Sequence, residues 1–359
     1  MSRPATPIRF GTDGWRAVIA REFTFENVRY CALGTAYYLR AAGLAKRGLV
    51  VGYDTRFASE DFAAEVARVT TAAGIKTYLC NSPAPTPAVS YNIVHRRAGG
   101  GVVITASHNS AEWNGFKYKP DYAGSASPEV VASLEKEIAQ AQTDICVNTI
   151  SLNKAQQQGL LQKIAPARPY LKNIARLIDL QRISNSGISI GIDSMYGSGA
   201  GYLTSALSGG RTHVTELHDK PNPLFPGMER PEPIGANLGE LSKLVRQGRL
   251  DVGIATDGDA DRLGIIDEYG QSITALQVFS LLCLYKLEVL GERGTIVKSI
   301  TQSSMVDQLG ELYGVPVITQ RVGFKYLGPV MMREDALAAG EESGGYAFRG
   351  NIPERDGIL

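Results

Sequence analysis

The 359-residue sequence has few cysteines, no long apolar run and no excess of charge of one sign. Its four cysteines, Cys31, Cys80, Cys146 and Cys283, are scattered without a CxxC pair, which argues against disulfides and zinc and predicts a reducing compartment. No apolar run approaches the ~20 residues of a membrane-spanning helix, and the N-terminal stretch lacks the apolar core of a secretory signal. These absences predict a cytoplasmic protein with no membrane partner.

The balance of positive and negative charge limits the classes of binding partner further. Lys and Arg number 37 against 36 Asp and Glu, which gives a formal net charge of +1. This balance argues against nucleic acid as the main partner and leaves small molecules. A hydrophobic content of 44% and a charged content of 20% are typical of a soluble globular protein, and the length indicates two or three domains.

Strands and helices alternate along the chain in three segments that repeat one plan. Such alternation implies βαβ units, so we expect an α/β fold of three similar domains whose mixed, largely parallel sheets surround a central cleft. The expected domains are residues 1–165, 166–270 and 271–359. The polar stretch 140–168 and the Pro-rich stretch 219–236 are interpreted as a connection and a loop. The expected strands are 48–54, 101–105, 188–193, 252–255 and 295–298, with helices near 59–73 and 303–312.

The most informative loop, residues 256–262, contains Asp257, Asp259 and Asp261 directly after the apolar run 252–255. Three carboxylates this close repel one another and raise each other's pKa unless a cation lies between them. The preceding run is expected to be a buried parallel strand, and open α/β sheets bind ligands at the carboxyl ends of such strands. Oxygen ligands suit Mg²⁺ or Ca²⁺ rather than zinc. The loop therefore predicts a catalytic divalent-metal site.

Two other structures can carry such a loop. A solvated turn also uses Asp and Gly, but it needs neither a third Asp nor an adjacent Arg262. An EF-hand calcium loop counted from Asp257 would place Glu268 at its twelfth position, yet Arg262 stands at the sixth, where that loop needs Gly. The catalytic metal loop is the interpretation that the residues favour.

Ser107 and His108 lie in a second polar loop, after the expected strand 101–105. Adjacent side chains rarely face each other, and a G-x-S-x-G elbow is absent, so a hydrolase is disfavoured. Taken alone, the loop is typical of a solvated turn. Beside an acidic metal loop, Ser107 becomes a candidate phosphoryl carrier, because phosphoserine adds about −1.5 to −2 charges at pH 7 that a divalent metal can neutralise.

Several cations are candidates for the same site. Lys117 becomes a candidate base if its neighbours lower its pKa, although most Lys side chains are solvated surface groups. Arg16, in the Gly-punctuated loop 11–16, offers a planar fork for phosphate oxygens. Lys325 and Arg355 are further cations that can face an anionic ligand.

Glu341 and Ser343 lie in the Gly-rich loop 340–345. Their short polar side chains can exchange hydrogen bonds with sugar hydroxyls. A tight turn with a helix cap is the alternative.

Taken in order, these loops resemble the α-D-phosphohexomutase superfamily, the phosphoglucomutase and phosphomannomutase enzymes. The matching motifs are GTDGWR at 11–16, TASHN at 105–109, NGFK at 114–117, DGDADR at 257–262 and GEESGG at 340–345. They span nearly the whole chain in the family's order. TASHN together with DGDADR is a highly specific combination.

The resemblance implies a role for each candidate residue. Ser107 is expected to be the phosphoserine and, with Asp257, Asp259 and Asp261, to hold one Mg²⁺ per chain. The remaining catalytic residues are expected to be Lys117 as general base, Arg16 and Arg262 as electrostatic supports, and His108 beside the serine. The residues expected to bind the substrate are Glu341, Ser343, Lys325 and Arg355.

The implied function is interconversion of glucose 1-phosphate and glucose 6-phosphate through a hexose 1,6-bisphosphate, which also serves as activator. Mannose phosphates are further candidate substrates, and the protein is expected to be a monomer or homodimer. The alternatives are a glucose 1,6-bisphosphate synthase, a phosphoglucosamine mutase and a non-catalytic sugar-phosphate-binding member. The Glu-Glu-Ser form of the sugar loop favours glucose.

The sequence departs from the family pattern in four places. The family's fourth domain, which binds the non-transferring phosphate, is expected to be absent from this chain, and weak or no mutase turnover is then expected of this polypeptide alone. Ser110 stands where Pro is usual, Ala17 replaces a frequent Gly, and Gly345 stands where bifunctional members carry a His.

Overall fold

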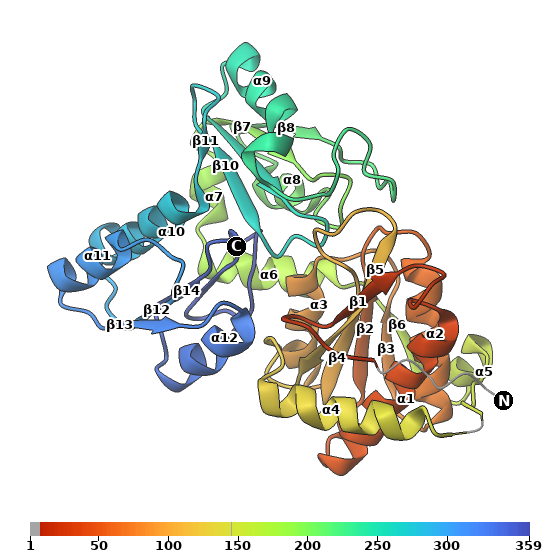
Figure 1. Cartoon of the computed structure of the whole chain (residues 1–359). Coiled ribbons are helices and arrows are strands. Elements are labelled where there is room, and N and C mark those ends of the chain that lie inside the picture. The colour runs from red at the N-terminus through yellow and green to blue at the C-terminus, as the bar shows by residue number, and fades with distance from the viewer. Residues whose placement is uncertain (1–7, 145) are drawn as a thin grey trace.

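The computed structural model describes residues 8–144 and 146–359, which form three α/β units (Figure 1). The first unit is built on a six-stranded sheet of order β1-β5-β4-β2-β3-β6. Its strands are β1 (Trp15–Val18), β2 (Leu49–Tyr53), β3 (Thr77–Cys80), β4 (Gly100–Ile104), β5 (Trp113–Pro120) and β6 (Leu161–Ile164). Its helices are α1 (Phe25–Ala41), η1 (Ala45–Arg47), α2 (Ser59–Ala72), α3 (Thr86–Arg96), α4 (Pro128–Ala141) and α5 (Leu152–Gln157).

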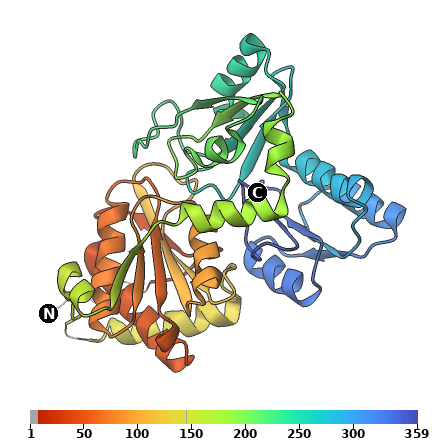
Figure 2. The ribbon, with the colours of Figure 1, turned by 180° about the vertical axis from the view of Figure 1, so that it is seen from behind.

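The second unit has a five-stranded sheet of order β11-β10-β9-β7-β8. Its strands are β7 (Ser189–Asp193), β8 (His213–Leu217), β9 (Val252–Thr256), β10 (Leu263–Ile266) and β11 (Ser272–Ile273). The accompanying helices are α6 (Ala167–Leu177), α7 (Leu180–Ser184), α8 (Tyr202–Leu207), η2 (Gly235–Asn237) and α9 (Gly239–Gly248). Seen from behind, α6 crosses between the first unit and the other two (Figure 2).

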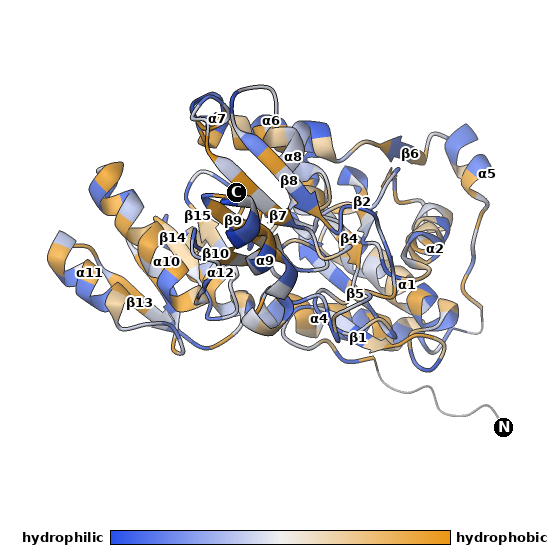
Figure 3. Cartoon of the chain, turned by 90° about the horizontal axis from the view of Figure 1, so that it is seen from above, coloured by the Kyte–Doolittle hydropathy of each residue, from blue (hydrophilic) through white to orange (hydrophobic). Residues whose placement is uncertain are grey.

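The third unit has a four-stranded sheet of order β13-β12-β14-β15. Its strands are β12 (Ile296–Ser299), β13 (Val317–Gln320), β14 (Ala338–Gly340) and β15 (Tyr346–Phe348). Its helices are α10 (Ala275–Leu284), the π-helical turn η3 (Tyr285–Val289), α11 (Met305–Tyr313) and α12 (Phe324–Arg333). Helix α10 is coloured mostly as hydrophobic in Figure 3, and its Val278, Phe279 and Cys283 enter the core.

The three sheets share one strand order. Three adjacent parallel strands are followed by one antiparallel strand, in the orders β3-β2-β4-β5, β8-β7-β9-β10 and β13-β12-β14-β15. The central strands are short apolar runs because helices cover both of their faces; β2, with the sequence LVVGY, is buried throughout. The predicted fold class, three similar α/β domains with mixed, largely parallel sheets, is confirmed.

The expected strands and helices lie close to the predicted ranges, with one exception. The stretch 140–168, predicted to be a connection, contains helix α5 and strand β6, and β6 pairs in parallel with β3. The prediction was wrong because β6 is an edge strand whose Gln162 and Lys163 are exposed, so its apolar pattern is weak. The stretch 219–236 is irregular up to the 3₁₀ turn η2, as predicted.

We propose the predicted limit at residue 165 for the first domain. For the second domain we propose a limit at Ile273 instead of the predicted 270, because β11 (Ser272–Ile273) pairs with β10 of the second sheet. Among the described helices, none has both the length and the apolar character needed to span a membrane.

Candidate active site

The polar loops occupy the same position in the three sheets. Each joins the third parallel strand to the antiparallel strand: residues 105–112 between β4 and β5, 257–262 between β9 and β10, and 341–345 between β14 and β15. Residues of all three loops, with β1 and the segment before it, line a pocket of about 520 Å³. Its lining includes Asp13, Arg16, His108, Asn109, Arg262, Glu341, Glu342, Ser343 and Arg355.

Ser107 is buried where the first and second loops meet. Its φ of 54° lies in the left-handed region that non-glycine residues rarely adopt, and its backbone N–H donates to Thr105 Oγ1 at 2.8 Å. This conformation brings its hydroxyl to within 2.8 Å of Asp257 Oδ2 and 3.3 Å of His108 Nδ1. A Cβ at Gly258 would lie 2.6 Å from the Ser107 carbonyl oxygen, so glycine is needed for this contact between the loops.

The three aspartates form the metal-type cluster that the sequence predicts. All three are buried, and one carboxylate oxygen from each lies within 4.8 Å of the others. The Oδ1 atoms of Asp259 and Asp261 have no hydrogen-bond partner among the described residues. Buried oxygens without partners are costly unless a cation binds them, and hard oxygen donors suit Mg²⁺. The chemistry of these donors therefore fits a Mg²⁺ site.

The surroundings exclude the calcium-loop alternative. The aspartates are flanked by strands β9 and β10, and Glu268 is exposed beyond the end of β10. Instead of an EF-hand turn, the loop is fixed by Asp257 Oδ1, which accepts from the backbone N–H groups of Asp261 at 3.0 Å and Arg262 at 3.2 Å.

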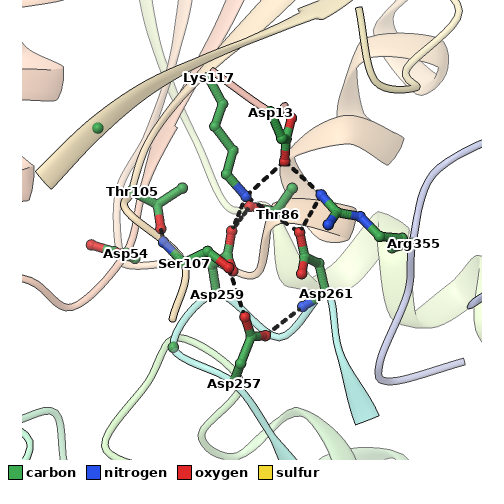
Figure 4. A network of polar contacts seen from close by, with 12 residues as sticks. Asp13, Asp54, Thr86, Thr105, Ser107, Lys117, Asp257, Asp259, Asp261 and Arg355 are labelled. Atoms are coloured by element: carbon green, nitrogen blue, oxygen red, sulfur yellow. Dashed lines mark hydrogen bonds and ion pairs between the residues drawn. The ribbon is translucent and has the colours of Figure 1, made fainter. Parts of the chain in front are cut away.

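The carboxylates differ in their electrostatic environment (Figure 4). Burial and the charges of Asp259 and Asp261 raise the pKa of Asp257 well above its usual range. Burial also opposes ionisation of Asp259, but the Lys117 ammonium and the hydrogen bonds from Lys117 and Thr86 outweigh it, so the pKa of Asp259 is lowered. Thr86, at the start of α3, donates to Asp259 Oδ2 at 2.5 Å.

Lys117 projects from β5 into the carboxylates. Its Nζ lies 2.7 Å from Asp259, 3.0 Å from Asp13 and 3.3 Å from Asp261. Burial lowers the pKa of this ammonium, but the three carboxylates outweigh burial and raise it. In this arrangement Lys117 is a charged partner of the acidic cluster.

Asp13 connects Lys117 to the third unit (Figure 4). Besides Lys117, its carboxylate contacts Lys119 Nζ at 3.0 Å and Arg355 Nη2 at 2.5 Å. Arg355 also lies 2.9 Å from Asp261 Oδ2, and Lys119 lies 2.5 Å from Glu354 Oε2. One buried ion-pair network therefore joins all three units.

The two arginines and the histidine predicted to support the serine line the pocket. Arg16 Nη1 donates to Asn109 Oδ1 at 2.7 Å, and Arg262 Nη1 donates to Glu232 Oε1 at 2.8 Å. Burial and the nearby guanidinium groups of Arg262 and Arg16 lower the pKa of His108 to about 2, so its imidazole is neutral.

Of the four residues predicted to bind the substrate, Glu341, Ser343 and Arg355 line the pocket and Lys325 does not. Glu341 and Ser343 line the pocket, and the buried Glu341 Oε1 accepts from Gly323 N–H at 2.9 Å. Burial raises the pKa of Glu341, against the opposing effect of Arg355. Lys325 is not among the residues that line this pocket; its Nζ donates to the Gly11 carbonyl at 3.3 Å.

Sequence reasoning missed Asp13, Thr86, Lys119 and Glu354. Asp13 lies inside the quoted motif GTDGWR, and Lys119 follows Lys117 by two residues on one strand, which puts both on the same face. These signals were present in the sequence. Nothing local marks Thr86 or Glu354, because their partners lie 173 and 235 residues away.

The fold and site are those of a protein of three similar α/β domains, in which a buried serine lies against three carboxylates and cations line a pocket between the domains. Comparisons with known proteins identify the family. The sequence matches the family descriptions "Phosphoglucomutase/phosphomannomutase, alpha/beta/alpha domain I" over residues 7–144, "domain II" over 168–270 and "domain III" over 276–359. The chain belongs to the phosphoglucomutase/phosphomannomutase superfamily, whose members are isomerases, and the match covers domains I to III.

Individual relatives agree with this assignment. The chain is 29% identical to a phosphoglucomutase/phosphomannomutase of Thermococcus kodakarensis, over 98% of this chain and 75% of the relative. It is 31% identical to a Pyrococcus furiosus protein named provisionally as a phosphoglucosamine mutase, over 93% and 70%. A Thermus thermophilus crystal structure, named provisionally as a phosphomannomutase, is 34% identical with a TM-score of 0.90, over 99% and 78%.

Proposed function

We propose that this chain acts as a phosphoserine- and Mg²⁺-dependent hexose-phosphate mutase that interconverts glucose 1-phosphate and glucose 6-phosphate through a hexose 1,6-bisphosphate. The observation that carries the proposal is the 2.8 Å approach of the buried Ser107 Oγ to the buried Asp257 Oδ2, which lie on loops of different domains. A hydroxyl held against an acidic cluster can carry a phosphoryl group there only if cations offset the added charge.

The metal role follows from the same oxygens. Asp257, Asp259 and Asp261, with an oxygen of phosphorylated Ser107, would hold one Mg²⁺. When bound, such a cation supplies electrostatic stabilisation of a transferring phosphoryl group. The chain's own arginines, Arg16 and Arg262, line the pocket and add preorganised positive charge.

The transfer itself needs positioning more than covalent chemistry. In the proposed step, a sugar hydroxyl oxygen forms a bond to phosphorus while the bond from phosphorus to Ser107 Oγ breaks, and the hydroxyl loses its proton. Lys117 is the proposed acceptor of that proton. Its ammonium is held charged by Asp13, Asp259 and Asp261, so Lys117 must first release its own proton to solvent and accept the new one as a neutral amine. That loss requires other cations to offset the three carboxylates.

The third-domain loop is proposed to read the sugar. The Gly323 N–H binds only Oε1 of Glu341, so Oε2 is proposed to accept a hydrogen bond from the sugar. Ser343 offers a hydroxyl in the same pocket. Arg355 and Lys325 are proposed to face the substrate phosphate, with Arg355 the better placed because it lines the pocket. His108 is proposed to act as a neutral hydrogen-bonding partner of Ser107.

A phosphoglucosamine mutase is the second candidate. The relative at 31% identity carries that name, and the Ser107 and aspartate loops would serve either sugar. We propose that the loop 341–345 of the third domain discriminates between glucose and glucosamine phosphates.

Intact-protein mass spectrometry tests the proposal. After incubation with glucose 1,6-bisphosphate and Mg²⁺, the chain should gain one phosphoryl group, and Ser107→Ala should gain none. Ser110→Ala, three residues along the same loop, is the matched control and should still gain the group. Glucose 6-phosphate should then discharge the wild-type adduct faster than glucosamine 6-phosphate or mannose 6-phosphate. An adduct on Ser107→Ala, or none on the wild type, would refute the proposed carrier.

A further inference from the structure

A buried arginine that does not line the pocket binds several backbone carbonyls of the loop that carries Ser107. Arg56 follows β2 and is 3% exposed. Its Nη2 donates to the Ser107 carbonyl at 2.7 Å and also to the Asn109 carbonyl. Its Nη1 donates to the carbonyls of Ser110 at 2.8 Å and Trp113 at 3.1 Å. One guanidinium therefore binds three backbone oxygens of the connection between β4 and β5 and a fourth at the first residue of β5.

This arrangement requires the geometry of arginine. A guanidinium presents five N–H donors in one rigid plane, whereas a lysine ammonium presents three around a point. Here the two terminal nitrogens bind the loop, and Nε lies 3.2 Å from Asp54 Oδ2. Asp54 is itself fixed, because its Oδ1 accepts from the Arg56 N–H at 2.9 Å and from Ser59 Oγ at 2.8 Å. Asp54 thus helps to orient the guanidinium of Arg56 toward the loop.

The loop depends on such external bonds. Ser107 has a left-handed φ of 54°, which carries a conformational cost for a non-glycine residue. Its carbonyl, the one that Gly258 approaches, is one of the four bound by Arg56. Without these bonds the serine would relax, and the 2.8 Å approach of its hydroxyl to Asp257 would be lost.

The other face of Arg56 contacts the second domain. Its guanidinium carbon lies 5.0 Å from the ring centroid of Phe225, a buried residue of the stretch 219–236. The neighbouring Thr55 hydroxyl donates to the Tyr196 carbonyl of the same domain at 2.9 Å. Arg56 therefore lies between the serine loop and the domain that supplies the aspartates.

We propose that Arg56 is a positioning residue, which fixes the Ser107 loop for phosphoryl uptake and ties that geometry to the docking of the second domain. It does not line the pocket, and among the described residues it makes no hydrogen bond or ion pair with the three aspartates of the cluster. Its charge interacts with Asp257 and Asp259 through space, whereas its direct contacts are with the backbone of the loop. The inference rests on the proposed function, because phosphoryl uptake by Ser107 is its readout.

The test compares phosphoryl uptake from glucose 1,6-bisphosphate in the wild type, Arg56→Lys and Arg56→Ala. A misplacement of about 1 Å can cost 100-fold in rate, so Arg56→Lys should take up the group about 100-fold more slowly at saturating donor. The donor concentration for half-maximal rate should change by less than about threefold, because Arg56 does not line the pocket. Arg47→Lys, a partly exposed arginine of the same domain, should match the wild type.

Chemical rescue separates positioning from general stability. Added guanidinium, at concentrations below those that unfold the protein, should speed uptake by Arg56→Ala at least about tenfold, whereas methylammonium should not, because only a planar fork can bind several carbonyls. Rates are normalised to the folded fraction measured by near-UV circular dichroism. Wild-type uptake by Arg56→Lys, a loss that merely follows the folded fraction, or the absence of rescue would each overturn the inference. No uptake by the wild type would instead refute the proposed function.

Discussion

Replacing Asp257 by Asn would remove one carboxylate of the metal-type cluster while keeping the loop. The amide oxygen can accept the backbone bonds from Asp261 and Arg262 that Asp257 Oδ1 accepts, and the amide nitrogen can donate to Ser107 Oγ. Two unit charges 4.8 Å apart, the upper limit for these oxygens, repel by about 3.5 kcal/mol at an effective dielectric constant of about 20. Lys117 and Arg355 offset much of the charge on Asp259 and Asp261.

The variant should therefore behave in opposite ways with and without metal. In metal-free buffer we expect Asp257→Asn to be as stable as the wild type or more stable by about 1–2 kcal/mol, because repulsion is relieved. At a Mg²⁺ concentration 100 times its dissociation constant, the wild type should gain about 2.7 kcal/mol. If the lost ligand weakens binding 100-fold, the variant would gain only about 0.4 kcal/mol at the same concentration.

Urea unfolding of EDTA-treated protein, with and without added Mg²⁺, measures both differences. Asp219→Asn is the matched control, since it removes the same charge from an exposed position of the second domain. A Mg²⁺-dependent gain in Asp257→Asn equal to that of the wild type would refute the metal assignment. A metal-free variant less stable than the wild type by more than about 1 kcal/mol would refute the repulsion argument.

Two further changes test the contacts between domains. Lys119→Met should cost about 3–5 kcal/mol in urea unfolding, because it removes the 2.5 Å partner of the buried Glu354 and leaves Arg355 Nε, at 3.5 Å, as its remaining cation. Lys325→Met, at a partly exposed site, should cost less than about 1 kcal/mol. A loss below about 1 kcal/mol in Lys119→Met would refute the importance of this ion pair. Gly258→Ala would bring a Cβ to 2.6 Å from the Ser107 carbonyl, so phosphoryl uptake should slow at least about tenfold, while Gly239→Ala, where a Cβ meets nothing within 4 Å, should leave it unchanged. Unchanged uptake in Gly258→Ala would mean that the loops tolerate separation.

The positions of most strands along the chain and the chemistry of the loops could be predicted from local sequence. Apolar runs such as LVVGY at β2 predict buried parallel strands, and three aspartates after β9 predict a metal loop without knowledge of any partner. Edge strand β6 was missed because two of its four residues face solvent. The apolar pattern of a sequence does not reveal a strand such as β6, which is stabilised mainly by hydrogen bonding to its neighbour β3.

The electrostatic state of Lys117 shows the second limit. From the sequence, a lysine near cations was expected to have a lowered pKa, and the structure surrounds it with three carboxylates that raise it. Two of these carboxylates lie more than 140 residues away, and the third, Asp13, lies 104 residues before it, so no spacing rule reveals their number. The sign of a buried pKa shift depends on a sum over the whole surroundings, and a motif supplies only part of that sum.

The ion pairs at the junction also explain why the three domains have to meet closely. Asp13 belongs to the first domain, Asp261 to the second and Arg355 to the third, and Arg355 contacts both carboxylates within 3 Å. Moving any one domain away would leave a buried charge without its partner, at a cost of several kcal/mol. A ligand that brings its own phosphate to the pocket would compete with these carboxylates for Arg355. Arg355 would then both stabilise the contact between the domains and bind an anionic substrate. Substrate binding would weaken the ion pairs of Arg355 with Asp13 and Asp261 and replace them with contacts through the substrate.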